Sequence, residues 1–279
     1  MRPTSLAIGT CLVALILIAN GMLSASTDEL VKFNGAQQRL LHERGENPQE
    51  LPGTAIEGYL TKPEGHGPFP AVILLHGCAG WSESSRQEKA DWFTKLGYAT
   101  LAVDSLGPRG LRDTCDHSMP ERDADAWGAL LYLSKRDFVD PRRVAVVGWS
   151  QGGIVALRIA SARLLVDFDI PDDLSFKAAV AYYPFCSMAA EQLSIPTLIF
   201  VGEVDDWAPA ADCQRWQRNT GEGASLQVVV YPGAFHGFDF PALGEGRRAF
   251  GHWLQFNRDA AERSMIEMRN FLAFQLGNR

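Results

Sequence analysis

Ser150 stands among glycines at the point where an apolar run changes its spacing. The segment "VAVVGWSQGGIVALRIAS", residues 144–161, begins with apolar, mostly β-branched residues and continues with apolar residues at helical spacing. This pattern predicts a buried strand, a sharp turn at Ser150 and a helix. Glycines let the backbone turn sharply there, so the serine hydroxyl can be exposed as a nucleophile. The alternative is a tight turn without chemistry.

A serine hydroxyl is a weak nucleophile at neutral pH, so it needs a base and a carboxylate that orients the base. His236, in "YPGAFHGFD", follows the last apolar run and lies between glycines. The stretch "GEVDDWAPA" offers two acids, and we choose Asp205, three residues after a glycine and four before a proline. Asp206 is the alternative acid, or else a cap for the next helix. Serine, aspartate, histidine is the chain order of α/β-hydrolase triads.

Nucleophilic attack on a carbonyl also needs donors for the oxyanion that forms. The residue after the nucleophile is Gln151, whose backbone N–H is the first candidate. The second donor comes from the loop after an earlier strand, where "HGCAG" places Cys78. His76 is interpreted as a neighbour of this oxyanion loop.

These residues require a sheet that brings the ends of several strands together. Short apolar runs alternate with helix-like stretches, which predicts an α/β fold with a mostly parallel central sheet and helices on both faces. "TAIEGYLTKP" adds an edge strand, and the stretch around His252 has helical spacing. Ligands of such sheets bind beyond the carboxyl ends of the strands, where Ser150, Asp205 and His236 fall. The expected strands are residues 71–76, 98–104, 143–149, 178–184, 196–202 and 226–232, and the expected helices are residues 87–96, 122–138, 153–164, 210–219 and 257–276.

The chain of 279 residues carries a net charge of −7 and has no run rich in lysine or arginine, which argues against nucleic acid as a partner. Its first 26 residues join Arg2 to an apolar run that ends in small residues, as in a secretory signal peptide. We therefore expect residues 27–279 to form one exported domain, periplasmic or secreted. An uncleaved N-terminal membrane anchor is the alternative.

Export changes the interpretation of the cysteines, because thiols pair in oxidising compartments. Four cysteines follow the leader, and they allow three connectivities. We expect Cys78–Cys115 and Cys186–Cys213, because each pair follows elements at the same edge of the sheet. Four buried free thiols are the alternative. The absence of a Cys-x-x-Cys pair in the sequence argues against a metal site.

Taken together, these motifs resemble the dienelactone hydrolase family of α/β-hydrolases. The resemblance runs from about residue 55 to residue 276, through "PAVILLHGCAG", "DSLGPRG", "VAVVGWSQGG", "GEVDDWAP" and "FHGF". It implies an α/β-hydrolase fold and hydrolysis of a small ester or lactone through an acyl-enzyme, without metal or organic cofactor. The namesake enzymes carry a cysteine nucleophile where this chain has Ser150, so opening of a dienelactone is not carried over.

Four further residues are candidates for substrate binding. The resemblance implies that Arg109, in "GPRG", binds a substrate carboxylate, and a structural ion pair with Asp104 or Asp113 is the alternative. Trp149, Trp207 and Trp81 lie close to catalytic positions in the sequence and are candidates for an apolar pocket, with core packing as the alternative. The long, aperiodic segment of residues 105–123 is expected to form a lid or a pocket wall.

Two other functions use the same fold. Acyl transfer to an alcohol or amine would use the same residues, and a non-catalytic binding protein would keep the fold without the chemistry. No triad position is missing from the sequence, which favours an enzyme acting on a small molecule. The sequence does not fix an oligomeric state.

Overall fold

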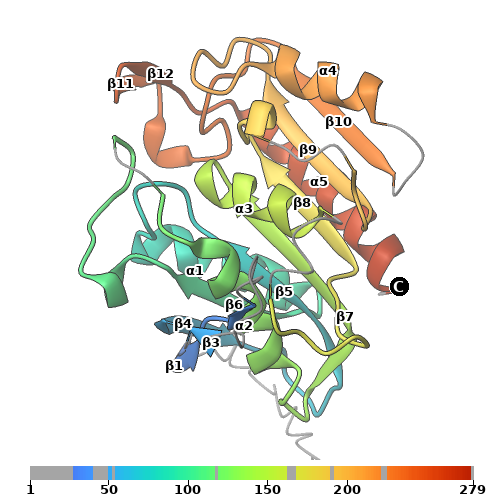
Figure 1. Ribbon diagram of the computed structural model, residues 1–279. Helices are drawn as coiled ribbons and strands as arrows, with labels where there is room; N and C mark the ends of the chain where they lie inside the picture. The colour runs from blue at the N-terminus through green and yellow to red at the C-terminus, as the bar shows by residue number, and fades with distance from the viewer. Residues whose placement is uncertain are drawn as a thin grey trace, which may run out of the picture.

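The computed structural model describes residues 28–39, 50–51, 54–116, 119–161, 168–188, 192–220 and 225–277. An eight-stranded sheet, in the order β1-β4-β6-β5-β7-β8-β9-β10, forms its centre (Figure 1). The six strands β6, β5, β7, β8, β9 and β10, which are adjacent in this order, are parallel to one another. Strand β4 is antiparallel to β6, and β1 is antiparallel to β4. The strands of this sheet are β1 (Glu29–Asn34), β4 (Ala55–Thr61), β5 (Phe69–Leu75), β6 (Ala99–Asp104), β7 (Val139–Trp149), β8 (Ala178–Tyr182), β9 (Thr197–Gly202) and β10 (Leu226–Tyr231).

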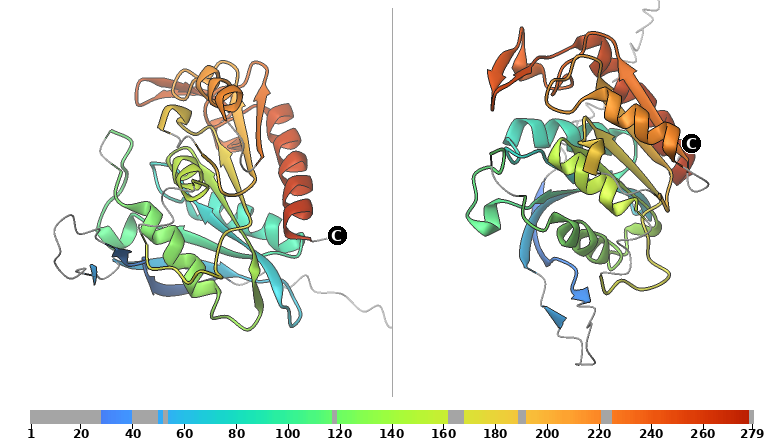
Figure 2. Two further views of the ribbon diagram at one scale, coloured as in Figure 1. Left: turned by 45° about the vertical axis from the view of Figure 1, so that its right-hand side comes forward. Right: turned by 45° about the horizontal axis from the view of Figure 1, so that its top comes forward.

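Helices cover both faces of this sheet, as the alternation of apolar runs predicts. One face packs against α1 and α5, through buried residues such as Phe93 and Leu272. The other face packs against α2, α3 and α4, and its core includes Trp127, Val155 and Cys213. Figure 2 shows α5 on the side of the sheet opposite α2 and α3. The helices are α1 (Glu83–Lys95), α2 (Arg122–Leu133), α3 (Gln151–Ile159), α4 (Ala210–Asn219) and α5 (Arg258–Leu276).

Short elements complete the described part of the chain. A hairpin follows His236 in the sequence and lies at the upper left of Figure 1. It pairs the two strands β11 and β12, and an isolated bridge joins His236 to Leu254 of β12. The remaining short elements are β2 (Gln38–Arg39), β3 (Glu50–Leu51), η1 (Gly107–Arg109), η3 (Cys186–Met188), η4 (Pro241–Leu243), β11 (Arg247–Ala249) and β12 (His252–Leu254).

Two expectations about the elements are wrong. The strand from "TAIEGYLTKP" is β4, which is not an edge strand, because β1 pairs with its outer side. The stretch around His252 is a strand of the hairpin, because it pairs with β11 and the His252 ring stacks on Trp207 of the acid loop. Residues 1–26 and His117 lie outside the described residues. Among the residues that are described, no helix is long and apolar enough to cross a membrane.

Both expected cysteine pairs are disulfide-bonded in the structure. Cys78, after β5, is bonded to Cys115 in the long segment after β6. Cys186 of η3 is bonded to Cys213 of α4. Each bond therefore ties a loop at the carboxyl ends of the strands to a second segment.

Candidate active site

The turn between β7 and α3 holds Ser150 in a conformation that few residues other than glycine adopt. Its φ is 52° and its ψ is −115°, and non-glycine residues with positive φ are uncommon. The flanking glycines make this turn possible: a Cβ on Gly148 would lie 2.0 Å from the Gly152 oxygen, and one on Gly152 would lie 2.1 Å from the Leu75 oxygen. The glycine spacing therefore reflects close backbone approach and explains how the serine is presented.

The structure brings together the three residues of the expected triad. Nε2 of His236 lies 3.0 Å from Oγ of Ser150, and Nδ1 of His236 lies 2.8 Å from Oδ2 of Asp205. All three side chains are buried. Both distances are within hydrogen-bonding range, so a proton can pass from the serine to the histidine.

The loop after β9 separates the roles of the two candidate acids. Oδ1 of Asp205 accepts the backbone N–H groups of Trp207 at 2.9 Å and Ala208 at 2.8 Å, which leaves Oδ2 for the histidine. Asp206 instead accepts the N–H of Trp253 in β12. Asp206 does not cap α4, whose N-cap residue is Pro209.

Aromatic rings pack on both sides of His236. Its ring centroid lies 4.5 Å from that of Tyr183 and 4.8 Å from that of Trp207. Trp207 in turn stacks on His252 of the hairpin, with 8° between the ring planes. The rings pack against the imidazole and restrict its rotation.

The loop after β5 is held by buried polar contacts. His76 accepts the N–H of Ser105 at Nε2, which leaves Nδ1 to donate to the Gly77 carbonyl at 2.6 Å. Burial and the charge of Arg122 lower the pKa of His76 well below its usual value, so the ring is neutral. Arg122 donates to the His76 carbonyl at 2.7 Å. These bonds orient the peptide that carries the Cys78 N–H.

A cavity of about 380 Å³ opens at the triad. Trp149 and Trp207 line it, as the sequence predicts for a substrate pocket, and Cys78 and Cys115 form part of its wall. Among the described residues that line it, Arg247 of β11 is the only one with a permanent charge. The remaining wall is mostly apolar and includes residues that sequence reasoning missed, Phe240, Leu243, Phe250 and Leu254, which come from the segment after His236.

The structure does not bring Arg109 into this cavity. Its guanidinium makes two hydrogen bonds of 2.8 Å to the carboxylate of Asp125 in α2, and a third bond of 2.7 Å goes to the Ser105 carbonyl. The expected role in binding a substrate carboxylate is therefore replaced by a structural ion pair. The partner is neither Asp104 nor Asp113, because the long segment folds back onto α2.

Asp239 is a further polar residue of the site that sequence reasoning missed. Its carboxylate accepts the indole N–H of Trp149 at 2.8 Å, the hydroxyl of Tyr183 at 2.5 Å and the ammonium of Lys89 at 2.9 Å. Burial and this carboxylate raise the pKa of Tyr183 well above its usual value, so the hydroxyl remains a donor. The only sequence signal is that Asp239 lies three residues after the candidate base.

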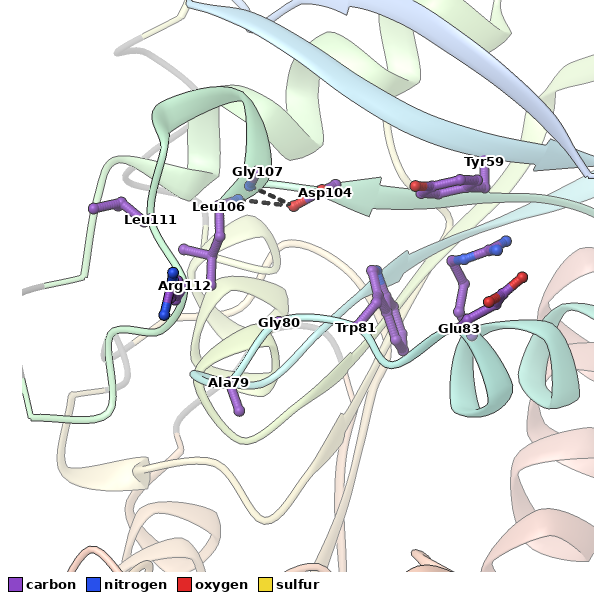
Figure 3. Close-up of a pocket in the computed structure, with 11 residues that line it drawn as sticks. Tyr59, Ala79, Gly80, Trp81, Glu83, Asp104, Leu106, Gly107, Leu111 and Arg112 are labelled. Carbon is purple, nitrogen blue, oxygen red and sulfur yellow. Dashed lines mark hydrogen bonds between the residues drawn. The ribbon is translucent and has the colours of Figure 1, made fainter.

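A second cavity, of about 490 Å³, shares Ala79 and Gly80 with the first. Figure 3 shows Tyr59, Trp81 and Asp104 around it, with the Asp104 carboxylate bonded to backbone N–H groups. No group of three or more His, Cys, Asp or Glu in the described ranges could hold a metal ion.

The chain is similar in sequence to several known proteins. Residues 56–275 match the dienelactone hydrolase family. An uncharacterised protein of Mycobacterium tuberculosis is 29% identical over 212 residues, which cover 70% of this chain and 72% of that protein. Esterase FrsA of Klebsiella pneumoniae is 30% identical over 131 residues, or 46% of this chain and 30% of the esterase.

Solved structures show the same fold at lower sequence identity. A putative dienelactone hydrolase from Klebsiella pneumoniae has a TM-score of 0.61 at 18% identity, covering 88% of this chain and 99% of that one. Esterase 2 of Thermogutta terrifontis, phosphoramylated by tabun, has a TM-score of 0.59 at 15% identity, covering 87% of this chain and 95% of that one. The family match spans most of the chain and the fold is that of the α/β-hydrolases, so the chain belongs to the dienelactone hydrolase family.

Proposed function

We propose that this protein is a serine hydrolase that cleaves a small carboxylic ester or lactone through an acyl-enzyme. The observation that carries the proposal is the continuous contact from Ser150 Oγ to His236 Nε2, at 3.0 Å, and from His236 Nδ1 to Asp205 Oδ2, at 2.8 Å. Membership of an ester-hydrolysing family and the similarity to esterases support the same reaction class.

In the first step, Ser150 Oγ attacks the ester carbonyl and its proton passes to His236 Nε2. The carbonyl oxygen becomes an oxyanion, for which the backbone N–H groups of Cys78 and Gln151 are the proposed donors. Asp205 stabilises the imidazolium through Nδ1. The carbon–oxygen bond to the alcohol then breaks, and His236 returns the proton to the leaving oxygen.

In the second step, water replaces the alcohol. His236 takes a proton from the water, whose oxygen attacks the acyl carbon, and a second oxyanion forms in the same place. The bond to Ser150 breaks, and the serine recovers its proton from His236. The carboxylic acid leaves and the enzyme is unchanged.

The cavity indicates an ester with an apolar body. Its volume of about 380 Å³ suits a small molecule, and aromatic side chains form much of its wall. Trp149 and Trp207 are the proposed contacts for the acyl or alcohol part.

We also propose that residues 1–26 form a removable leader and that residues 27–279 act as one exported domain. The two disulfides support this location, because disulfides persist in oxidising compartments. N-terminal sequencing of the protein purified from the periplasm or the medium tests it, and a chain that retains residue 1 in the cytoplasm would contradict it.

The function is tested by covalent labelling with a fluorophosphonate, followed by peptide mapping. We expect label on Ser150 alone, loss of label in Ser150→Ala, and release of acid from short aryl esters by the unmodified protein. An unlabelled protein that releases no acid from any ester of a broad panel would exclude the proposal. Products formed with an added alcohol distinguish hydrolysis from acyl transfer.

A further inference from the structure

Thr114 is a buried residue in the segment between β6 and α2 that contacts both loops of the proposed oxyanion hole. It is 2% exposed. Its backbone N–H donates to the Cys78 carbonyl at 2.9 Å. Its hydroxyl donates to Oε1 of Gln151 at 2.7 Å, and its carbonyl accepts Nε2 of Gln151 at 2.9 Å. The side chain of Gln151 is thus held by two bonds to one residue.

The two proposed oxyanion donors come from independent loops. Cys78 follows β5, whereas Gln151 begins α3 after β7. The strength of an oxyanion hole depends on the separation and direction of its donors, because each must lie about 2.7–3.1 Å from the developing charge. A contact that links the two loops therefore affects transition-state stabilisation more than substrate binding.

The segment that carries Thr114 is itself fixed at several points. The Cys78–Cys115 disulfide joins its next residue to the first oxyanion loop. Near its start, Arg109 is ion-paired with Asp125, which has a fully buried side chain. Because of these anchors, residues 105–116 form a rigid support for the first oxyanion loop and a wall of the pocket, not a lid.

We propose that Thr114 is a positioning residue that sets the geometry of the oxyanion hole by linking Cys78 to Gln151. The proposal rests on the proposed serine hydrolase function. Thr114 is not proposed to contact the substrate. Replacement of Thr114 is therefore expected to change kcat and not KM.

The first test compares Thr114→Val with Thr114→Ser. Valine has nearly the same shape but cannot donate to Gln151, whereas serine keeps the hydroxyl. Since removal of one oxyanion donor costs about 10²–10³ in kcat, we expect a displaced donor to cost about tenfold in Thr114→Val, with KM within about twofold. Thr114→Ser should retain at least about half of the wild-type kcat.

Inhibitor affinity provides a readout that a general structural defect would not move selectively. An aryl trifluoromethyl ketone forms a hemiketal when Ser150 Oγ bonds to its carbonyl carbon, the serine proton goes to His236 and the carbonyl oxygen becomes the oxyanion. We expect Thr114→Val to weaken this inhibitor by the same factor as kcat. The corresponding methyl ketone, which stays a ketone, should bind equally to both proteins.

Two further variants keep the test decisive. Gln151→Met removes the bond from the Thr114 hydroxyl and also the bond from Gln151 Nε2 to the Thr114 carbonyl, and it keeps the backbone N–H of residue 151. It covers the case in which Thr114→Val does not fold. Thr94→Val is the matched control, because the Thr94 hydroxyl donates to the Ala90 carbonyl within α1, at 2.8 Å. Unchanged kcat and unchanged ketone affinity in both Thr114→Val and Gln151→Met would overturn the inference. Equal losses in kcat and methyl ketone binding would also overturn it. A wild-type protein that neither labels nor turns over esters would instead overturn the proposed function.

Discussion

Ser150 illustrates how a backbone conformation positions a hydroxyl group at the scale of one residue. The positive φ of a non-glycine residue costs free energy, of order 1–3 kcal/mol, and persists only where neighbouring structure imposes it. Here the hydrogen bond from the Ser150 N–H to the Tyr182 carbonyl, at 2.9 Å, and the close packing of glycines impose it. The result is an oxygen fixed 3.0 Å from a histidine nitrogen.

The first prediction concerns Ser150 and His236. If they act as one unit, Ser150→Ala and His236→Ala should each lower kcat by a factor on the order of 10⁶, and the double variant should lose little more. Ester hydrolysis by the three variants, with circular dichroism as the folding control, measures this. Losses that multiply in the double variant would show that the two residues act independently.

The second prediction separates the neighbouring aspartates. Asp205→Asn should lower kcat by roughly 10⁴, because an amide at Oδ2 favours the wrong histidine tautomer. Asp206→Asn is the matched control and should lower kcat by less than about tenfold, because its carboxylate faces the hairpin and is half exposed. A larger loss in Asp206→Asn than in Asp205→Asn would contradict the assignment of the acid.

At the scale of elements, the active site depends on how closely β7, α3 and β5 approach one another. Gly148 and Gly152 have no room for a side chain, since an added Cβ would meet backbone atoms at about 2 Å. The rigid backbone cannot move aside as the end of a flexible side chain would. The turn that presents Ser150 therefore has no room for one additional carbon atom at Gly148 or Gly152.

The third prediction follows from this packing. Gly148→Ala should destabilise the fold by about 1–3 kcal/mol or more and lower activity, because the turn must open to admit a methyl group. Gly110→Ala is the contrasting control, because its added Cβ meets nothing within 4 Å but its φ of 67° disfavours alanine, whereas Gly148 does not have a positive φ. Urea unfolding of both variants measures the difference, and a loss in Gly148→Ala no larger than that in Gly110→Ala would contradict a dominant cost of crowding.

The fourth prediction concerns the disulfide between η3 and α4. Cys186 and Cys213 are separated by 27 residues, and closure of such a loop reduces the entropy of the unfolded chain. Replacing both by serine should therefore lower the free energy of unfolding by roughly 3–4 kcal/mol. Denaturant titration of the non-reduced proteins measures the loss, and an equal stability of variant and wild type would show that the bond contributes nothing.

At the scale of the whole molecule, buried charges gather where α2 meets the sheet. Asp123, Asp125 and Arg122 have fully or almost fully buried side chains and lie near the paired Arg109 and Arg158. Burial raises the pKa of Asp123 from 3.8 to about 6, and the attraction of Arg158 only partly opposes this. Burial likewise lowers the pKa of Arg122 to about 10, so it remains charged at neutral pH.

The fifth prediction is a pH dependence of stability. Asp123 binds a proton more tightly in the folded protein than in the unfolded chain. Its protonation therefore contributes to the free energy of unfolding below about pH 4, and this contribution is lost as the pH rises through about 6. Asp123→Asn, which stays neutral, should gain stability relative to wild type by an amount on the order of 2 kcal/mol between pH 4 and pH 7. Unfolding curves of both proteins at the two pH values measure this. A constant difference between the proteins would show that the carboxyl does not titrate in this range.

Much of this molecule is encoded in local patterns of its sequence. The period of the apolar runs predicts the strands and helices, because burial on a sheet or helix selects residues at fixed spacing. The strand-turn-helix pattern around Ser150 and the glycines beside His236 place both residues at strand ends, where a parallel sheet must bring them together. These signals are local in the sequence, so they can be recognised without knowledge of the fold.

Other features depend on contacts between distant segments and were decided only by the tertiary structure. Arg109 pairs with Asp125 and not with a substrate, because the segment after β6 folds onto α2. The β11–β12 hairpin reaches the acid loop through Asp206 and Trp207. Thr114 meets Gln151 across 37 residues of sequence. The sequence by itself determined which residue types stand at the strand ends, because the spacing of apolar residues and glycines is local. Only the tertiary structure decided which side chains line, brace or avoid the cavity, because hydrogen bonds and packing between remote segments leave no periodic trace along the chain.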